Sequence, residues 1–154
     1  MEENFSIVNK TKSKLPSLPF FDIKNDILKN KYELSIAFVD KKISRSLNKK
    51  YRNKDKATNV LYFSLDKNSG ELILCPDIIK TETKKFEKKF PDLLLFLVIH
   101  GMLHLKGMQH GAIMERAEKK YSQKYDTQHS NRNRHRILDD KNRGRRIYQR
   151  RKKS

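Results

Sequence analysis

The most informative stretch of the sequence is residues 91–110, which read PDLLLFLVIHGMLHLKGMQH. Pro91 suits the first turn of a helix, where its missing N–H has no partner to lose, and Gly107 suits the end of one. Between them lies the longest uninterrupted apolar run of the chain, Leu93 to Ile99. We therefore expect a helix from Pro91 to about Lys106. The apolar run is far shorter than the roughly 20 residues that a membrane-spanning helix needs.

Three of the five histidines of the chain, His100, His104 and His110, lie in this stretch. Residues four apart on a helix lie about 6 Å apart along one face, so the first two can offer their imidazoles to one point. A turn at Gly107 lets the third histidine approach the same point from outside the helix. Three nitrogen ligands suit one tetrahedral ion, most simply Zn²⁺, with the fourth position left open for chemistry.

The spacing H-x3-H-x5-H is also that of metzincin proteases, which need a glutamate directly after the first histidine. Here that position is Gly101, which cannot move a proton, so proteolysis by that route is disfavoured. The pattern is also compatible with a non-catalytic RNA-binding factor that has a structural zinc, and with a metal-dependent hydrolase of another substrate. A structural zinc usually has four protein ligands. No fourth ligand is near in sequence, but Cys75 or a distant acid can still close the site in space.

Charge points to the class of partner. The chain has 154 residues, enough for one domain with a hydrophobic core, and a formal net charge of +18. A surplus of this size indicates a polyanionic partner, most simply nucleic acid.

Half of that charge lies in residues 128–154, where eleven Lys/Arg against two acids leave +9. Because apolar residues are sparse there, we expect a disordered basic tail after a domain of residues 1–127. Its histidines, His129 and His135, are expected to be solvated. The tail is expected to contact nucleic acid through its arginines: Arg132, Arg134, Arg136, Arg143, Arg145, Arg146, Arg150 and Arg151.

The N-terminus predicts no signal peptide, because Met1-Glu2-Glu3-Asn4 is acidic and no long apolar segment follows it. The single cysteine, Cys75, cannot form an internal disulfide and reads as a buried strand thiol without chemistry. We therefore expect a reducing cytoplasm.

Hydrophobic periodicity predicts the remaining elements. We expect strands over 32–38, 59–63 and 71–75, the last two joined as a hairpin by turn residues 66–70. Residues 1–21 read as a leading strand or loop. We expect four further helices, over about 22–31, 41–52, 81–90 and 115–125. In the second of them, Ile43, Leu47 and Tyr51 form a common apolar stripe.

The histidine motif resembles the signature H-G-x-L-H-L-x-G-x-D-H of the YbeY family, bacterial endoribonucleases of ribosomal RNA maturation and ribosome quality control. The chain matches it at His100, Gly101, Leu103, His104, Leu105, Gly107 and His110. Two more segments resemble the family: Leu47-Asn48 and Tyr51-Arg52 with Asp55-Lys56, Thr58-Asn59-Val60-Leu61 and Phe63, and then Gly70-Glu71-Leu72-Ile73. The resemblance covers about residues 32 to 121.

The resemblance implies an α+β fold, a small mixed sheet packed with helices, with the metal-binding helix at its centre. It implies single-strand-specific, metal-dependent cleavage of RNA, chiefly ribosomal RNA, with ribosomal proteins or assembly factors as further candidate partners. The three histidines would hold the metal, and Arg52 would be the functional arginine, whose guanidinium suits a scissile phosphate. Attack by metal-activated water and attack by the 2′-hydroxyl of the RNA both remain open.

Two positions depart from the family pattern. Gln109 stands where an acid usually precedes the third histidine; an aspartate there would orient a ligand through a hydrogen bond, whereas glutamine adds no negative charge. Tyr62 stands where a serine is usual, on the strand next to the expected site.

Overall fold

The structure is a computed structural model that describes residues 4–126. The predicted tail, with its arginines and with His129 and His135, lies outside the described residues.

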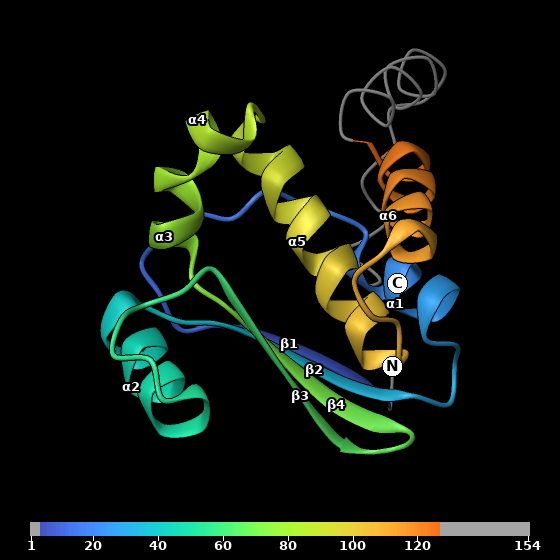
Figure 1. The fold of residues 1–154 in the computed structure, drawn as a ribbon, viewed down its shortest axis with the longest axis horizontal. Coiled ribbons are helices and arrows are strands. Elements are labelled where there is room, and N and C mark those ends of the chain that lie inside the picture. Colours follow the sequence, from blue (N-terminus) through green and yellow to red (C-terminus); the bar gives the residue numbers. More distant parts are fainter. Residues whose placement is uncertain (1–3, 127–154) are drawn as a thin grey trace.

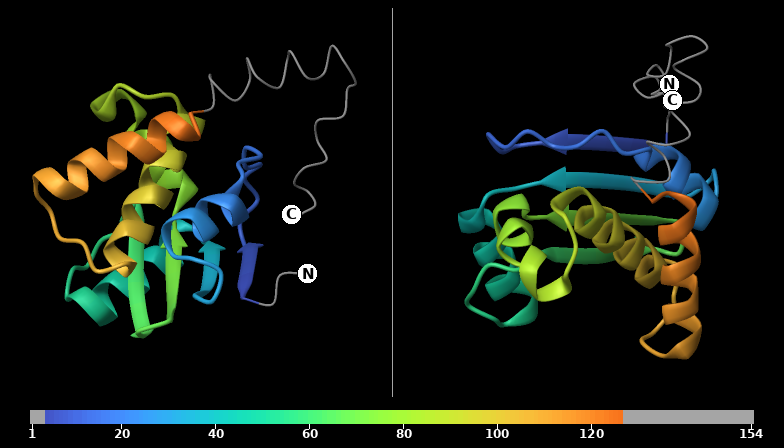
Figure 2. Two further views of the ribbon diagram at one scale, coloured as in Figure 1. Left: turned by 90° about the vertical axis from the view of Figure 1, so that its right-hand side faces the viewer. Right: turned by 90° about the horizontal axis from the view of Figure 1, so that it is seen from above.

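Four strands form one mixed sheet in the order β1-β2-β4-β3. β1 pairs with β2 and β2 with β4 in parallel, whereas β3 and β4 form an antiparallel hairpin. The α+β fold and the hairpin are therefore confirmed, and the leading segment supplies a strand. Figure 2 shows the row of strands from β1 to the hairpin. The strands are β1 (Phe5–Asn9), β2 (Glu33–Phe38), β3 (Val60–Asp66) and β4 (Ser69–Leu74).

The sheet has one strongly apolar face. Leu34, Ile36 and Phe38 alternate along β2 with more exposed residues, and each is almost fully buried. They stand beside buried residues of β4, with Ile36 opposite Leu72 and Phe38 opposite Leu74. Side chains two apart on a strand share a face, so these residues form a continuous apolar surface.

Helix α5 (Phe90–Leu105) lies against this surface and packs on β3, β4 and α6 (Ala112–Lys124) (Figure 1). Its residues from Leu93 to Leu103 are almost all buried, which explains why the sequence is apolar around the whole helix there. The prediction of a helix that begins at the proline and ends before Gly107 is confirmed, and so is its central place. None of the helices in residues 4–126 is long and apolar enough to cross a bilayer.

Helix α2 (Lys41–Arg52) forms where it was predicted, capped by Asp40, but it buries a different face. Ser44 and Asn48 are buried, whereas Ile43 and Tyr51, from the expected apolar stripe, are exposed. Hydrogen bonds of the buried polar side chains explain which face of α2 packs inward. Ser44 Oγ donates to the carbonyl oxygen of Thr58 and accepts from its N–H, each at 2.9 Å, and Asn48 Nδ2 donates to the carbonyl of Lys56 at 2.9 Å. These bonds fasten α2 to the segment that leads into β3.

Three short helices differ from the sequence-based expectation. Helix α1 (Phe20–Ile27) begins two residues before Asp22 and stops early, and Lys29 turns the chain with a φ of 79°. The helix expected over 81–90 is only the short α4 (Thr83–Phe86), and an unpredicted helix, α3 (Pro76–Thr81), precedes it. Pro76 starts α3 at a first-turn position, and Glu87, with a φ of 54°, ends α4.

Candidate metal centre

The three histidines of the motif come together in space. Their ligand nitrogens all lie within 4.8 Å of one another, and His100 and His104 project from consecutive turns of α5. His110 reaches them from the link between α5 and α6. His100 and His104 are partly buried, whereas His110 is exposed. One ion can therefore contact all three side chains while one side of the group faces solvent.

The end of α5 sets this geometry. Gly107 has a φ of 109°, its N–H donates to the carbonyl of His104 at 2.9 Å, and the N–H of Met108 donates to the carbonyl of Leu103 at 3.0 Å. This pair of bonds is a Schellman motif, which needs a left-handed residue at the glycine position. The predicted role of Gly107 is confirmed. Gly111 follows His110 with a φ of 151°, also a backbone region favoured by glycine, and leads the chain into α6.

Hydrogen bonds determine which ring nitrogen of His100 and of His104 is free to bind a metal. Nδ1 of His100 lies 2.6 Å from Oε2 of Glu118, and Nδ1 of His104 lies 3.1 Å from the carbonyl oxygen of Met108. A carbonyl or carboxylate oxygen accepts, so each Nδ1 carries the proton. Nε2 of both rings is then the nitrogen with a lone pair to give to a metal.

Burial lowers the pKa of His104, and the neighbouring His100 and His110 lower it further. A metal-binding imidazole has to be neutral. The lowered pKa therefore keeps His104 ready to bind a cation at pH values where an exposed histidine is partly protonated.

Arg52 and Tyr62 stand beside the histidines. The rings of Tyr62 and His104 are stacked, with centroids 4.6 Å apart and planes 6° from parallel. The guanidinium carbon of Arg52 lies 5.1 Å from the centre of the Tyr62 ring, and its Nη2 lies 3.5 Å from the carbonyl oxygen of Tyr62. Arg52 is exposed but is in contact with the strand next to the histidines, unlike a cation that extends freely into solvent at a helix end.

A cavity of about 300 Å³ opens next to the histidines. Phe86, Phe96, His100, His110 and Glu118 are among its lining residues. The ring of Phe96 stacks against that of His100 with centroids 6.0 Å apart. The group of three nitrogens therefore faces a space with an aromatic wall and one carboxylate.

A scan of protein-family models matches residues 7–132 to the model described as endoribonuclease YbeY. The chain belongs to the YbeY family. A relative of that name from Staphylococcus aureus is 32% identical over 121 residues, covering 70% of this chain and 77% of its own length. One from Staphylococcus epidermidis is 36% identical over 104 residues (58% and 67%), and one from Bdellovibrio bacteriovorus is 41% identical over 80 residues (51% and 53%).

The fold has a similar solved structure. The solution structure of TM1509 from Thermotoga maritima superposes with a TM-score of 0.58 at 27% identity, covering 77% of this chain and 86% of that one. The residues matched by the family model, 7–132, include helix α5 and the link to α6, which carry the three histidines.

The structure explains why position 101 is a glycine in this YbeY family member. A Cβ built on Gly101 would lie 2.6 Å from Cδ2 of Leu72, a fully buried residue of β4. The glutamate that a metzincin protease carries at this position would therefore point toward the sheet and displace the side chain of Leu72. The close packing of α5 on β4 thus disfavours a glutamate at position 101. The glycine that is present has no side chain that could carry a proton.

No fourth metal ligand joins the histidines among residues 4–126, because the group contains no Cys, Asp or Glu. Cys75 is buried where β4 leads into α3, and burial raises the pKa of its thiol. A buried protonated thiol is unreactive, in keeping with the absence of a predicted role. The described ligand set thus differs from the closed four-ligand set of a structural zinc.

Glu118 is the site residue that the sequence did not predict. The family pattern has an acid at position 109, where this chain has an exposed glutamine, and a carboxylate next to the histidines comes instead from α6. Glu118 is 18 residues from His100 along the chain and looks, in the sequence, like any acid on an amphipathic helix. Only the packing of α6 on α5 places it against the imidazole.

Proposed function

We propose that this YbeY family member is a metal-dependent endoribonuclease that cleaves single-stranded ribosomal RNA, with one Zn²⁺ per chain held by His100, His104 and His110. The observation that carries the proposal is the approach of the three ring nitrogens to within 4.8 Å beside an open cavity. The geometry suits a three-histidine ion with an exchangeable position, which is the arrangement of catalytic rather than structural zinc sites.

In this proposal the side chains divide the work. Zn²⁺ at this position supplies Lewis acidity toward a phosphoryl oxygen. Glu118 and the carbonyl of Met108 hold the imidazoles of His100 and His104 in one tautomer. Arg52, next to Tyr62, binds the scissile phosphate through its paired N–H donors and stabilises the charge that grows there during cleavage.

The wider assignment follows the same reasoning. We propose residues 1–127 as the endoribonuclease domain and residues 128–154 as an RNA-affinity tail. The net charge of +18 supports RNA, chiefly ribosomal RNA, as the partner. The unpaired, buried Cys75 supports the cytoplasm as the compartment.

The test compares the wild-type chain with His104→Ala, and with His129→Ala as a control histidine outside the motif. Zinc content is measured by elemental analysis, and cleavage of single-stranded RNA and of casein is followed with chelator and after zinc is restored. We expect RNA cleavage that chelation abolishes and zinc restores, no casein cleavage, and loss of zinc and cleavage only in His104→Ala. Equal zinc in the two variants would remove the metal assignment; chelator-resistant RNA cleavage would remove the mechanism.

A further inference from the structure

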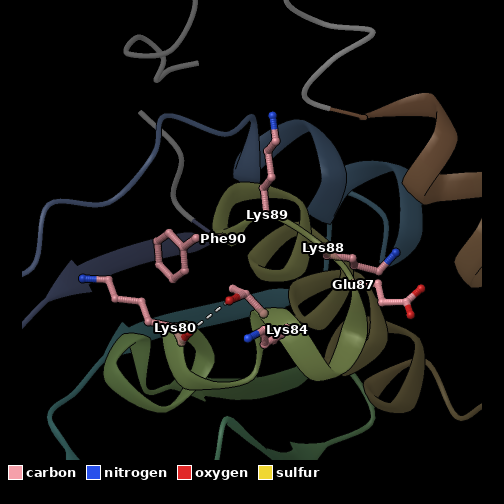
Figure 3. Close-up of a pocket in the computed structure, with 7 residues that line it drawn as sticks. Lys80, Lys84, Glu87, Lys88, Lys89 and Phe90 are labelled. Atoms are coloured by element: carbon pink, nitrogen blue, oxygen red, sulfur yellow. Dashed lines mark hydrogen bonds between the residues drawn. The ribbon is translucent and has the colours of Figure 1, made fainter.

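A dense group of lysines lies between α3 and the start of α5. Residues 80–89 contain five lysines against two glutamates, a net charge of +3 in ten residues, and all five lysines are exposed: Lys80, Lys84, Lys85, Lys88 and Lys89. Four of them line an open hollow of about 770 Å³, together with Thr83, Glu87 and Phe90 (Figure 3). We call residues 80–90 with Phe96 the α3–α4 basic surface.

Phenylalanines alternate with these cations. The Nζ atoms of Lys80, Lys85 and Lys88 lie 5.4, 5.4 and 5.6 Å from the ring centres of Phe90, Phe86 and Phe96, respectively. The three rings are only partly buried. Cations that follow a phosphate backbone, combined with aromatic rings on which bases stack, are how proteins bind single-stranded nucleic acid without reading its sequence.

The α3–α4 basic surface continues into the metal centre. Phe86 and Phe96 also line the cavity that contains His100 and His110, and Phe96 stacks on His100. Phe90 and His100 are ten residues apart on α5, which corresponds to about 15 Å along a helix axis. A strand of RNA that crosses the surface would therefore arrive at the histidines.

We propose that the α3–α4 basic surface is a second RNA-binding site, which holds the phosphates of single-stranded RNA on one side of the scissile bond. The inference rests on the proposed function for its choice of polyanion. It differs from the assignment of the tail, because these lysines are part of the folded domain and adjoin the catalytic cavity. The lysine–phenylalanine pairs favour a single strand over an acidic protein, which would offer carboxylates but no bases to stack.

The test compares two full-length, zinc-loaded double variants with the same change in net charge. Lys84→Gln/Lys88→Gln removes two cations of the basic surface. Lys10→Gln/Lys31→Gln removes two exposed cations near β1 and the start of β2, toward the edge of the sheet opposite to β3. Binding of a short single-stranded RNA with methylated 2′-hydroxyls is titrated at several salt concentrations, and a gel confirms that the RNA stays intact.

Each phosphate contact on a single strand contributes about −0.7 to the slope of log K against log salt. We expect the slope of Lys84→Gln/Lys88→Gln to be shallower by about 1.4, and that of the control to stay at the wild-type value. On cleavable RNA the first variant should raise KM and leave kcat and zinc content unchanged. If both variants show the same slope, the basic surface does not contact RNA and the proposal is overturned.

The aromatic part has its own variant. Phe86→Leu keeps an apolar side chain for packing but removes the ring. Stacking does not release counterions, so we expect several-fold weaker binding at every salt concentration with an unchanged slope. Wild-type binding together with a wild-type slope would overturn the stacking role. Because these are binding titrations, a failure to cleave RNA would count against the proposed function without changing their result.

Discussion

Glu118 holds the imidazole of His100 from α6, a helix that carries none of the three histidines. Its carboxylate is mostly buried, with a side-chain exposure of 13%, so the contact is little screened by water. A carboxylate in this position fixes the tautomer and orientation of a ligating histidine and makes the other nitrogen a better donor. We therefore expect Glu118 to have a positioning role, because it contacts His100 rather than the proposed metal.

Glu118→Gln should weaken zinc binding about 10- to 100-fold, the usual effect of changing a partner of a metal ligand. Glutamine keeps the size of the side chain but removes its charge. Zinc affinity is measured by competition with a chelator. Glu115→Gln is the matched control, because Glu115 lines the same cavity on the same helix and is exposed. Similar affinities for the two variants would show that the charge of Glu118 does not act on the metal centre.

Tyr62 connects Arg52 with the metal centre. Its ring contacts His104 by stacking and the guanidinium of Arg52 by a cation–π contact. Stacked aromatic pairs and exposed cation–π contacts each contribute about 0.5–1 kcal/mol or somewhat more. These contacts bring the cation to the wall of the site without burying its donors, which leaves them available to a phosphate.

Arg52→Ala should lower kcat for RNA cleavage by about 100- to 1000-fold, the cost of losing one donor aimed at developing negative charge, roughly 2.7–4 kcal/mol. Zinc content should not change, and the free energy of unfolding should fall by no more than about 0.5–1 kcal/mol, because Arg52 is exposed and loses only its contacts with Tyr62. Arg45→Ala is the control on the same helix; Arg45 pairs with Asp55 on the surface, and such pairs contribute little. An unchanged cleavage rate in Arg52→Ala would reduce the residue to a surface cation.

At the scale of elements, the site depends on how α6 is held, since α6 carries Glu118. The C-terminal end of α6 is fastened to α1: Lys124 Nζ and Tyr125 Oη donate to the same oxygen of Asp26, at 2.6 and 2.7 Å. Burial raises the pKa of Asp26, but the two hydrogen bonds outweigh it and the pKa lies below the usual value. Burial and the contact with Asp26 raise the pKa of Tyr125.

Tyr125→Phe should therefore lower the free energy of unfolding by about 1.5 kcal/mol at neutral pH, the contribution of a hydrogen bond to a charged group. The folded-state pKa of Asp26 is depressed, so its stabilisation is present above the ordinary aspartate pKa of about 3.9 and is lost as the pH falls through the folded-state value. The difference between wild type and variant should shrink in acid. Denaturant unfolding at neutral pH and near pH 3 measures both effects.

Tyr121→Phe, one turn earlier on α6 and outside the contact with Asp26, is the control for that experiment and should change stability less. If Tyr125→Phe and Tyr121→Phe had the same effect at both pH values, the link to Asp26 would contribute nothing specific.

At the scale of the whole molecule, the positive charge is divided equally between two parts of the chain. Residues 128–154 carry +9, and the remaining +9 lies on residues 1–127, a third of it on residues 80–89. We expect two kinds of RNA contact: contacts of the tail cations with phosphates, and contacts of the lysines and phenylalanines of the α3–α4 basic surface. Both are electrostatic, so both are measured by salt dependence.

Truncation after Thr127 should flatten the slope of log K against log salt by about 3–4 units if about five of the eleven tail cations contact RNA at once. Affinity at low salt should fall, while zinc content and the rate at saturating RNA stay at wild-type values, because the three histidines remain. Binding titrations of the full-length and truncated chains decide the matter. Parallel slopes would show that the tail does not contact RNA, and its role would then be to bind a protein partner or to maintain solubility.

The local part of the site followed from the sequence alone. The helix predicted from Pro91 to about Lys106, the turn at Gly107 and the approach of the three histidines depend on the spacing of neighbouring residues, and the structure contains all three features. The β3–β4 hairpin was equally local, because its turn residues adjoin both strands. Helical and extended periodicity fix which side chains share a face within one element, and one sequence carries that information.

The rest depended on contacts between distant segments. Nothing in the spacing of Ser44 and Asn48 shows that they bond to the segment before β3, in an arrangement that leaves Ile43 and Tyr51 of α2 exposed. Tyr62 and His104 are 42 residues apart, and Glu118 reaches His100 from another helix. Such pairs form only when packing brings the helices onto the sheet. Periodicity within each element therefore determined the histidine group, whereas packing between elements decided which residues hold it in place.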